Sequence, residues 1–390
     1  MKPYKALNEK PFYALMALIC LPIIVSFLSR YKDPSNNDFE AFYLCASRWL
    51  QGDPIYLSSD AFPFKYPPIT ILFFSPLALV SIDHARWVLG LINLSACLSI
   101  PWALHYVFNN EFIPNNPNQR RLFLLTSFAG LIASLRFIDN EFHSKNINQL
   151  TYALIVWSLV LLKNPKNIFR EFFGIFLFMF GGIFKLTPLL GLTPQSLNFK
   201  NKRYGLLFAG ALCVALLPNP ILWKNWLEQI KSTTGFFPFS DRSIYFQGFF
   251  AMGSHFLGLP SRSNLSLLLA LPFVGLLLFR TLKILQYKKH QTSMVTLSLV
   301  WILLSLLINP LPWQHIYGFF WIILPALFYC DQKSQYTKHI WALCLFLALS
   351  PRSIIGTNAA YWLEVNQSIA LIALLTIMLA SKIILTTNDK

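Results

Sequence analysis

The chain has 390 residues, of which 55% are hydrophobic and 12% are charged. An ordinary soluble domain carries about 25% charged residues, so this composition excludes that class and indicates a membrane protein. The net charge of +16 does not point to nucleic acid, because Lys and Arg gather in short segments between apolar runs and form no basic stripe.

Uncharged apolar runs recur along the whole sequence. A helix needs about 20 apolar residues to cross a bilayer, and several of these runs qualify. Their even spacing predicts an all-α polytopic membrane protein with a single domain, residues 1–390. The runs are Pro11–Ser29, Trp87–Asn110, Tyr204–Trp223, Gln291–Cys330 and Val365–Ser381.

The first run is predicted to be a retained helix. The residues after it, Arg30-Tyr31-Lys32-Asp33, offer no small-residue site for signal-peptide cleavage. With the N-terminus in the cytoplasm the chain emerges outside at Arg30, so residues 30–84 form a first outer loop. We expect a helix in that loop because apolar residues repeat there at three- and four-residue spacing. They are Phe39, Phe42, Tyr43, Ala46 and Leu50.

One apolar segment in the first half is predicted not to cross the membrane. The basic loop Lys163–Arg170 belongs inside, yet four apolar segments separate it from Arg30, and four crossings would return the chain to the outside. Pro67–Ser81 is the weakest of them, because it is short and interrupted by Pro76, so we place it at the outer interface. The other three are Ala85–Phe108, Leu122–Leu135 and Ile147–Leu162.

The same charge rule orders the second half. Phe172–Phe199 lies between two basic segments, so it is predicted to be a hairpin of two short helices that turns near Lys185 on the outer side. Tyr204–Pro218 then crosses outward, and residues 219–262 form a second outer loop. About twelve crossings result, with both termini in the cytoplasm. The last five are Ser263–Leu282, Thr292–Asn309, His315–Cys330, Ile340–Ser353 and Gln367–Leu385.

Asp38, at the start of the helical stretch, is the first candidate for chemistry. One interpretation is an N-cap, in which the carboxylate accepts hydrogen bonds from backbone N–H groups of the first turn. The other is a catalytic carboxylate at the membrane edge, where the low dielectric strengthens its attraction for a proton. The two interpretations are compatible, since a capped Asp is also held in place.

A longer pattern extends from Asp38 to Trp87. It reads Asp38…Phe42-Tyr43…Ala46…Leu50…Gly52…Tyr56…Phe64…Tyr66-Pro67-Pro68…Pro76-Leu77…Ala85…Trp87. This pattern resembles the N-terminal signature of glycosyltransferase family 87. Further segments similar to the family follow in the family's order, so that the resemblance covers most of the chain. They are Phe184-Lys185-Leu186-Thr187-Pro188, Ser243-Ile244 through Phe249, and Trp313-Gln314-His315-Ile316-Tyr317.

The resemblance implies a GT-C-type membrane enzyme with about 12 transmembrane helices and a helical first outer loop. It implies an inverting transfer in which Asp38 deprotonates an acceptor hydroxyl, which attacks the anomeric carbon of a sugar carried on a polyprenyl phosphate. The sugar is expected to be a hexose, mannose by the family, and the acceptor a lipid or glycan. A departing phosphate needs no general acid, so a single carboxylate suffices, unlike in glycoside hydrolysis. No metal and no cofactor are implied.

Several positions of the pattern are expected to contact substrate. Lys185 lies at a turn between apolar helices, where a cation is costly unless an anion meets it. It either reaches the outer headgroups or contacts the donor phosphate, and its predicted side of the membrane favours the phosphate. His315 is either a helix-end histidine or a contact for phosphate or sugar, and Arg242 is a further phosphate contact. Tyr43 and Tyr66 belong to the same expected site through the family pattern.

One element departs from the family. Gly-Gln-x-Asn is common there at the outer start of a helix, where this chain reads Lys145-Asn146-Ile147-Asn148. Asn148 fits, and Asn146 retains an amide on a shorter side chain. Both are expected to contact the substrate. Lys145 replaces the glycine and adds a positive charge, which affects the expected sugar specificity.

Asp139 and Glu141 flank Asn140 and lie near His143. An Asp/Glu/His cluster suggests a metal site, but this spacing is not distinctive of one. We interpret the segment as a solvated turn on the outer side.

An alternative function is a secondary transporter or flippase for lipid-linked or sugar substrates, and a third is a non-catalytic assembly subunit. Transporters place ionisable residues near mid-membrane on broken helices, whereas the apolar runs here are mostly free of charge. The sequence also contains no P-loop and no GxGxxG after a strand. We therefore predict a plasma-membrane glycosyltransferase with its site on the outer face.

Overall fold

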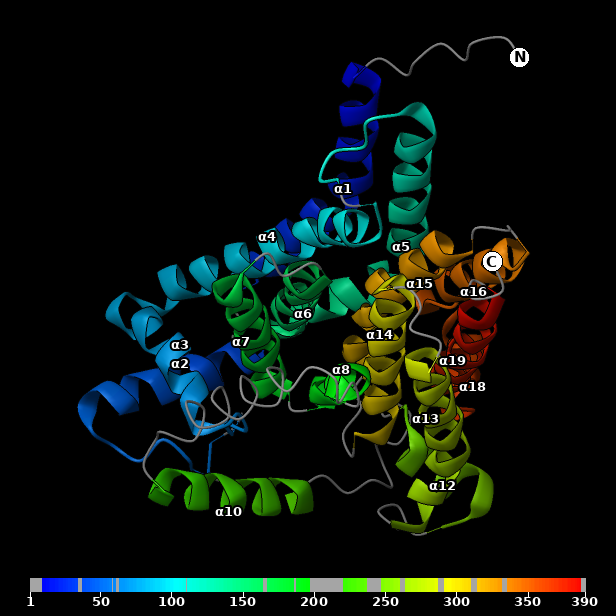
Figure 1. The fold of residues 1–390 in the computed structure, drawn as a ribbon. Helices are drawn as coiled ribbons and strands as arrows, with labels where there is room; N and C mark the ends of the chain where they lie inside the picture. The colour runs from blue at the N-terminus through cyan, green and yellow to red at the C-terminus, as the bar shows by residue number, and fades with distance from the viewer. Residues whose placement is uncertain are drawn as a thin grey trace, which may run out of the picture.

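The computed structural model describes residues 9–33, 37–57, 59–60, 63–109, 111–163, 167–185, 187–196, 220–236, 247–259, 264–286, 291–309, 314–331 and 335–386. Within these ranges the chain is helical and contains no strand, which confirms the all-α class. Figure 1 shows α1 beside the upper part of α5 at the top of the molecule and α10 along its lower edge.

Apolar helices long enough to cross a membrane make the chain a multi-pass membrane protein. Among the described residues four helices qualify by length and composition, and α18 with α19, bent by 59° at their junction, form a fifth candidate. The predicted total of about twelve crossings stays a prediction. The four are α1 (Glu9–Tyr31), α4 (Ile82–Asn109), α5 (Pro117–Ser144) and the span Leu265–Gln286, which joins most of the 3-10 helix η5 (Asn264–Ala270) to α13 (Leu271–Gln286).

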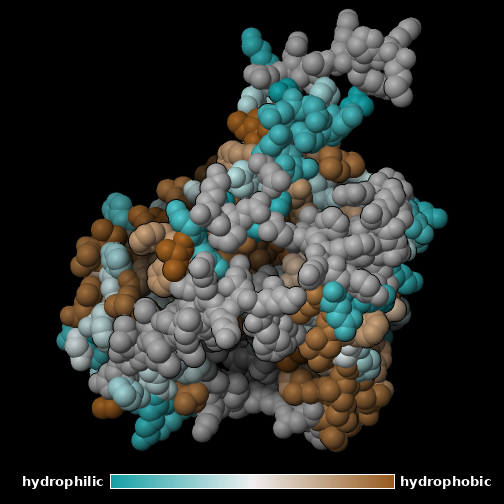
Figure 2. Space-filling model, in the orientation of Figure 1, coloured by the Kyte–Doolittle hydropathy of each residue, from teal (hydrophilic) through white to brown (hydrophobic). Residues whose placement is uncertain are grey.

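The outward faces of these helices are apolar. Figure 2 shows apolar surface over the lower right of the molecule, where α12 and α13 lie. Contiguous exposed apolar surface of this kind marks a membrane contact. Exposed apolar side chains include Leu18, Leu21 and Val25 of α1, and Leu271, Phe279 and Leu282 of α13.

α5 is the central helix of the described structure. It packs against α1 on one side and against α15, α16 and the 3-10 helix η6 on another. Beside it, α4 packs against α6, and α6 packs against α7. The remaining elements of this part are α6 (Asn148–Lys163), α7 (Ile168–Lys185), α14 (Gln291–Ile308), η6 (Gln314–Phe319), α15 (Phe320–Cys330), α16 (Thr337–Leu349), α17 (Arg352–Ile355), α18 (Thr357–Val365) and α19 (Ser368–Thr386).

The segment predicted to be the first outer loop packs around an aromatic cluster. The predicted helix is present as α2 (Asn37–Gln51), and the Phe42 ring stacks on Phe74 at a centroid distance of 4.5 Å. Phe42 is fully buried, whereas Leu50 is 49% exposed. Leu50 lies in the last turn of α2, beyond the contact with the short helices η1 (Pro68–Thr70), α3 (Ile71–Phe74) and η2 (Ser75–Leu79).

Those short helices correspond to the segment predicted not to cross. Its apolar length is 12 residues, Pro68–Leu79. Even as one α-helix this would span about 18 Å, well below a hydrocarbon core of about 30 Å, which favours an interfacial position.

Two predicted boundaries change. α5 continues without interruption to Ser144, so the solvated turn expected at Asp139–Glu141 is wrong. The hairpin after α7 does turn at Lys185, but its second arm starts with the 3-10 helix η3 (Thr187–Leu192) and one turn of α8 (Thr193–Ser196). The span expected at 204–218 lies outside the described residues. Within the expected second outer loop the structure has two helices, α10 (Pro220–Phe236) and α12 (Phe249–Leu257).

Candidate active site

Asp38 lies in the first turn of α2, where a carboxylate is stabilised by the positive end of the helix dipole. Its Oδ2 accepts a hydrogen bond of 2.5 Å from the side-chain amide of Asn146. Asp38 therefore has a fixed partner outside its own helix, on the turn that joins α5 to α6.

The orientation of the Asn146 amide follows from its other contacts. Its Oδ1 accepts hydrogen bonds from the Tyr66 hydroxyl at 3.4 Å and from the backbone N–H of Ile147 at 2.8 Å. Since the oxygen is engaged by two donors, the amide nitrogen is the atom that faces Asp38. The structure thus brings Asp38, Asn146 and Tyr66 together.

The turn 145–148 is also held by α4, through Asn93. The Asn93 amide donates to the backbone carbonyl of Asn146 at 3.0 Å and accepts from the backbone N–H of Leu150 at 2.9 Å. Asn93 is fully buried. Sequence reasoning did not select this residue, although an amide inside an apolar run was the available signal.

Lys145 ends α5 in the left-handed conformation, with φ 51°. This conformation favours glycine, because it brings a Cβ close to the following carbonyl. The glycine expected here from the resemblance would adopt this conformation without strain, whereas Lys145 adopts it with a Cβ. The Lys145 ammonium donates to the backbone carbonyl of Asp33 at 3.1 Å, which ties the turn to the end of α1.

Two lysines lie near the Asp38 carboxylate. The Lys185 ammonium, at the end of α7, is 5.2 Å from the centroid of the Tyr66 ring and interacts electrostatically with Asp38. Lys65, just before Tyr66, also interacts with Asp38. Burial lowers the pKa of Lys65, and the attraction of Asp38 offsets this only in part. Two ammonium groups, from segments far apart in the sequence, thus interact with the Asp38 carboxylate.

Tyr66 stays protonated in this environment. Burial first, and then the negative charges of Asp38 and Glu141, raise the pKa of its hydroxyl well above the ordinary value. The hydroxyl is therefore a permanent donor to Asn146. Tyr43 does not join this group, because its hydroxyl donates to the backbone carbonyl of Val80 at 2.9 Å and links α2 to the end of η2.

Glu141 and Asn148 form a buried pair next to the turn. The Glu141 carboxylate accepts from the backbone N–H of Asn148 and from its side-chain amide, the latter at 2.5 Å. Both residues are fully buried. Asn148, expected to contact the substrate, is thus engaged by Glu141, and Glu141, expected in a solvated turn, is a buried partner of the site.

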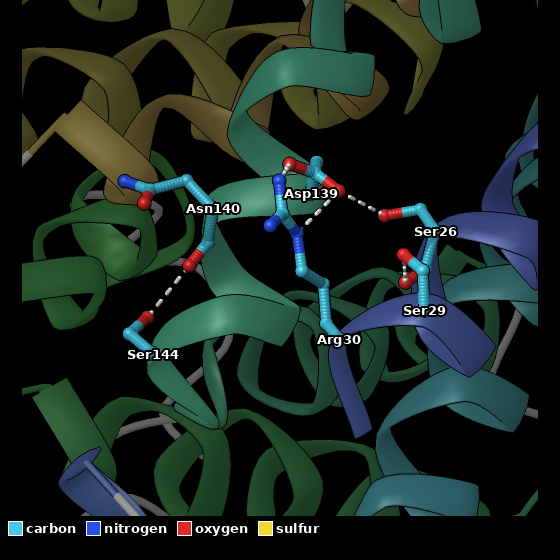
Figure 3. Close-up of polar contacts among 6 residues, drawn as sticks. All are labelled: Ser26, Ser29, Arg30, Asp139, Asn140 and Ser144. Atoms are coloured by element: carbon cyan, nitrogen blue, oxygen red, sulfur yellow. Dashed lines mark hydrogen bonds and ion pairs between the residues drawn. The ribbon is translucent and has the colours of Figure 1, made fainter. Parts of the chain in front are cut away.

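Asp139 faces in another direction. Figure 3 shows its carboxylate between Arg30 and Ser26 of α1, with Arg30 bonded to both oxygens at 2.5 and 3.0 Å and Ser26 at 2.6 Å. Asp139 and Glu141 therefore serve different helices and do not converge on a common point. In the described ranges no group of three His, Cys, Asp or Glu side chains suits a metal ion.

α10 packs against the segment predicted to be the first outer loop. The buried Trp226 donates its indole N–H to the backbone carbonyl of Lys65 at 3.0 Å, and Gln229 donates to that of Leu57 at 3.3 Å. The backbone of His315 lies in η6, but its side chain is outside the described part, and so is the whole of Arg242.

Comparison with known families decides the class of protein. The family model of glycosyltransferase family 87 matches residues 64–310, more than half of the chain. The chain belongs to glycosyltransferase family 87. The matched range includes Tyr66, Asn146 and Lys185 and begins after Asp38. The suspected family is thus confirmed, and this family 87 member is a membrane glycosyltransferase.

A curated relative of this family 87 protein is distant. It is the polyprenol-phosphate-mannose-dependent alpha-(1-2)-phosphatidylinositol mannoside mannosyltransferase of Mycobacterium tuberculosis (strain ATCC 25618 / H37Rv). The two are 26% identical over 218 residues, which are 51% of this chain and 49% of the relative. The chain thus spans about half the length of that relative. No solved structure matches the chain.

Proposed function

We propose that this glycosyltransferase transfers a hexose, mannose, from a polyprenyl-phosphate donor to a hydroxyl group of a lipid or glycan acceptor, with Asp38 as the general base. The observation that carries the proposal is the Asp38 carboxylate, which is held by the neutral Asn146 amide and has the ammonium groups of Lys65 and Lys185 near it. A fixed base beside cations meets the needs of a phosphate-linked sugar donor.

In the proposed reaction Asp38 takes the proton of the acceptor hydroxyl. The acceptor oxygen forms a bond to the anomeric carbon, and the bond from that carbon to the phosphate oxygen breaks. The electron pair of the broken bond leaves with the polyprenyl phosphate. Attack from the face opposite the phosphate inverts the configuration, and the phosphate departs without needing a proton.

Lys185 and Lys65 are the proposed contacts of the donor phosphate. Like charges held close together in a partly buried site repel each other, and an anion between them removes that cost. Lys65 indeed disfavours the charged form of Lys185, while Asp38 and Glu141 favour it. His315 and Arg242 remain proposed substrate contacts, for sugar or phosphate.

Donor and location rest on the family and the relative. The M. tuberculosis enzyme is polyprenol-phosphate-mannose-dependent by its name, and we extend that donor to this chain. The proposed location is the plasma membrane, with one domain (1–390), both termini in the cytoplasm, and the outer loops 30–84 and 219–262 on the outer face. This arrangement follows the positive-inside rule.

The test is an assay in membranes with radiolabelled polyprenyl-phosphate mannose and extracted envelope lipids as acceptors. Asp38→Asn keeps the size of the side chain but removes the base, so transfer is expected to fall by about 100-fold or more. Asp53→Asn is the matched control, because Asp53 is an exposed carboxylate of the same loop, and its transfer is expected to equal that of the wild type.

The outcomes separate the parts of the proposal. Transfer retained in Asp38→Asn removes Asp38 as the base. Transfer from a different polyprenyl-phosphate sugar corrects the donor only. No transfer from any such sugar, together with uptake or flipping of the labelled lipid, favours the transporter.

A further inference from the structure

The Glu141 carboxylate is the central acceptor of the hydrogen bonds around the turn 145–148. It is fully buried, yet each of its oxygens receives a donor from Asn148, one from the backbone and one from the side chain. A buried carboxylate is kept in a fold only where such donors and nearby cations replace its lost hydration. Because the backbone N–H that it accepts belongs to Asn148, the first residue of α6, the carboxylate also lies at the positive end of that helix.

Glu141 holds the turn on both sides of Asn146. Its backbone carbonyl accepts the N–H of Asn146 at 3.3 Å, and its carboxylate holds Asn148, two residues further on. Glu141 therefore binds the turn at the backbone of Asn146, whose amide donates to Asp38 at 2.5 Å, and again at Asn148. A shift of Asn148 is passed to Asn146 through only one intervening residue.

The charge of Glu141 belongs to the same environment. It interacts electrostatically with Lys185 and, with opposite sign, with Asp38. Glu141 thus offsets part of the positive charge of Lys185.

We propose that Glu141 is a positioning residue of the transfer reaction: it fixes the turn 145–148 so that Asn146 holds the Asp38 carboxylate ready for proton removal. The inference rests on the proposed role of Asp38. Glu141 acts through Asn148 and Asn146, and its own oxygens are occupied by Asn148, so it is not a catalytic residue.

Glu141→Gln tests this with a minimal change. The negative charge is lost and one acceptor oxygen becomes an NH2 group, so both bonds to Asn148 are kept only if the Asn148 amide turns over, and the hold on the turn is weakened. The expected result is a kcat lower by about 10- to 100-fold with the KM for polyprenyl-phosphate mannose little changed, because displacement of the base slows the chemical step.

A compensating variant distinguishes positioning from a general loss of folding. Adding Asn148→Asp to Glu141→Gln restores a donor–acceptor pair, so most of the lost kcat is expected to return. Asp139→Asn is the matched control: it removes an acid two residues earlier on the same helix, but one that faces α1 (Figure 3). Its kcat is expected to stay at the wild-type value.

The inference is overturned if Glu141→Gln keeps wild-type kcat while Asp38→Asn is inactive, or if Asp139→Asn lowers kcat to the same extent.

A measurement that needs no activity tests the positioning role even if the proposed function is wrong. In the Asp38→Cys, Asn146→Cys background with Glu141 intact, a short bifunctional thiol reagent is expected to join the two positions, with mass spectrometry identifying the joined peptides. The yield should fall with Glu141→Gln and not with Asp139→Asn, and equal yields would refute the positioning role.

Discussion

The side-chain amide of Asn146 donates a hydrogen bond of 2.5 Å to the Asp38 carboxylate, across 108 residues of sequence. The amide oxygen is engaged by Tyr66 and Ile147 at the same time, so the amide cannot rotate without breaking these contacts. Asp38 is therefore oriented by a neutral group, which fixes its position and leaves its negative charge in place.

Replacing Asn146 with Asp is predicted to impair the base through its charge. Two carboxylates at hydrogen-bond distance cannot both ionise easily, so the pair retains a proton to higher pH than Asp38 alone. The acid limb of kcat/KM should move to higher pH, and transfer near neutral pH should fall by about tenfold or more.

Two variants are controls for this effect. Asn146→Ala removes the hydrogen bond without adding charge, so it should lower kcat and move the acid limb much less than Asn146→Asp does. Asn118→Ala, at an exposed position before the site, should match the wild type. An unshifted acid limb in Asn146→Asp would contradict the assignment.

The lowered pKa of Lys65 predicts that the KM for the donor changes at alkaline pH. Burial lowers its pKa, so its ammonium loses a proton at a lower pH than an exposed lysine, whose pKa is about 10.4. As pH rises through this lowered pKa, the positive charge at the proposed phosphate site is lost and the KM for the donor should increase. Lys65→Arg keeps its charge at all these pH values, so the increase should disappear.

The measurement is donor KM from about pH 7 to 10. Lys32→Arg, at an exposed lysine near the end of α1, should show the wild-type increase. The phosphate role of Lys65 is wrong if Lys65→Arg and the wild type follow the same curve.

The left-handed backbone at Lys145 can be tested by comparing two variants. Lys145→Gly and Lys145→Ala both lose the bond to the Asp33 carbonyl, but only Ala keeps a Cβ at φ 51°. The glycine variant should be more stable than the alanine variant by about 1 kcal/mol. Thermal unfolding in detergent measures the order of the two, and equal or reversed melting temperatures would show that the turn is not strained.

The crossing of α1 and α4 depends on Gly90. A Cβ at this position would overlap the Tyr31 ring, which is itself buried. Gly90→Ala should therefore push the helices apart and cost about 1–3 kcal/mol, seen as a lower yield of monodisperse protein and a lower melting temperature. Gly275→Ala in α13 meets nothing within 4 Å and should be neutral or slightly stabilising.

Helix positions follow from the sequence where an apolar run stands alone. The predicted spans Pro11–Ser29 and Ala85–Phe108 match α1 and α4 within three residues at each end, since such runs have few other ways to satisfy their backbone in a membrane. α5 is longer than the predicted Leu122–Leu135. The sequence predicted a turn at its polar end, because the partners of Asp139 and Glu141 lie on α1 and α6 and a local pattern does not reveal them.

The site was predicted residue by residue but not as an assembly. Asp38, Asn146 and Lys185 were each selected, yet the bond between the first two depends on how α2 docks against α5 and α6, and no spacing encodes that. Glu141 was missed because an acidic residue next to polar neighbours is typical of a solvated turn, whereas here the side chain is buried against Asn148. A usable signal was an acid seven residues before an Asn that starts an apolar helix.

α10 is attached to the segment predicted to be the first outer loop by two hydrogen bonds that both end on main-chain carbonyl oxygens, those of Lys65 and Leu57. Every amino acid supplies such an oxygen, so this attachment places no demand on the identity of the residues beneath it. Side chains at positions 57 and 65 can thus be replaced without loss of these two hydrogen bonds to α10.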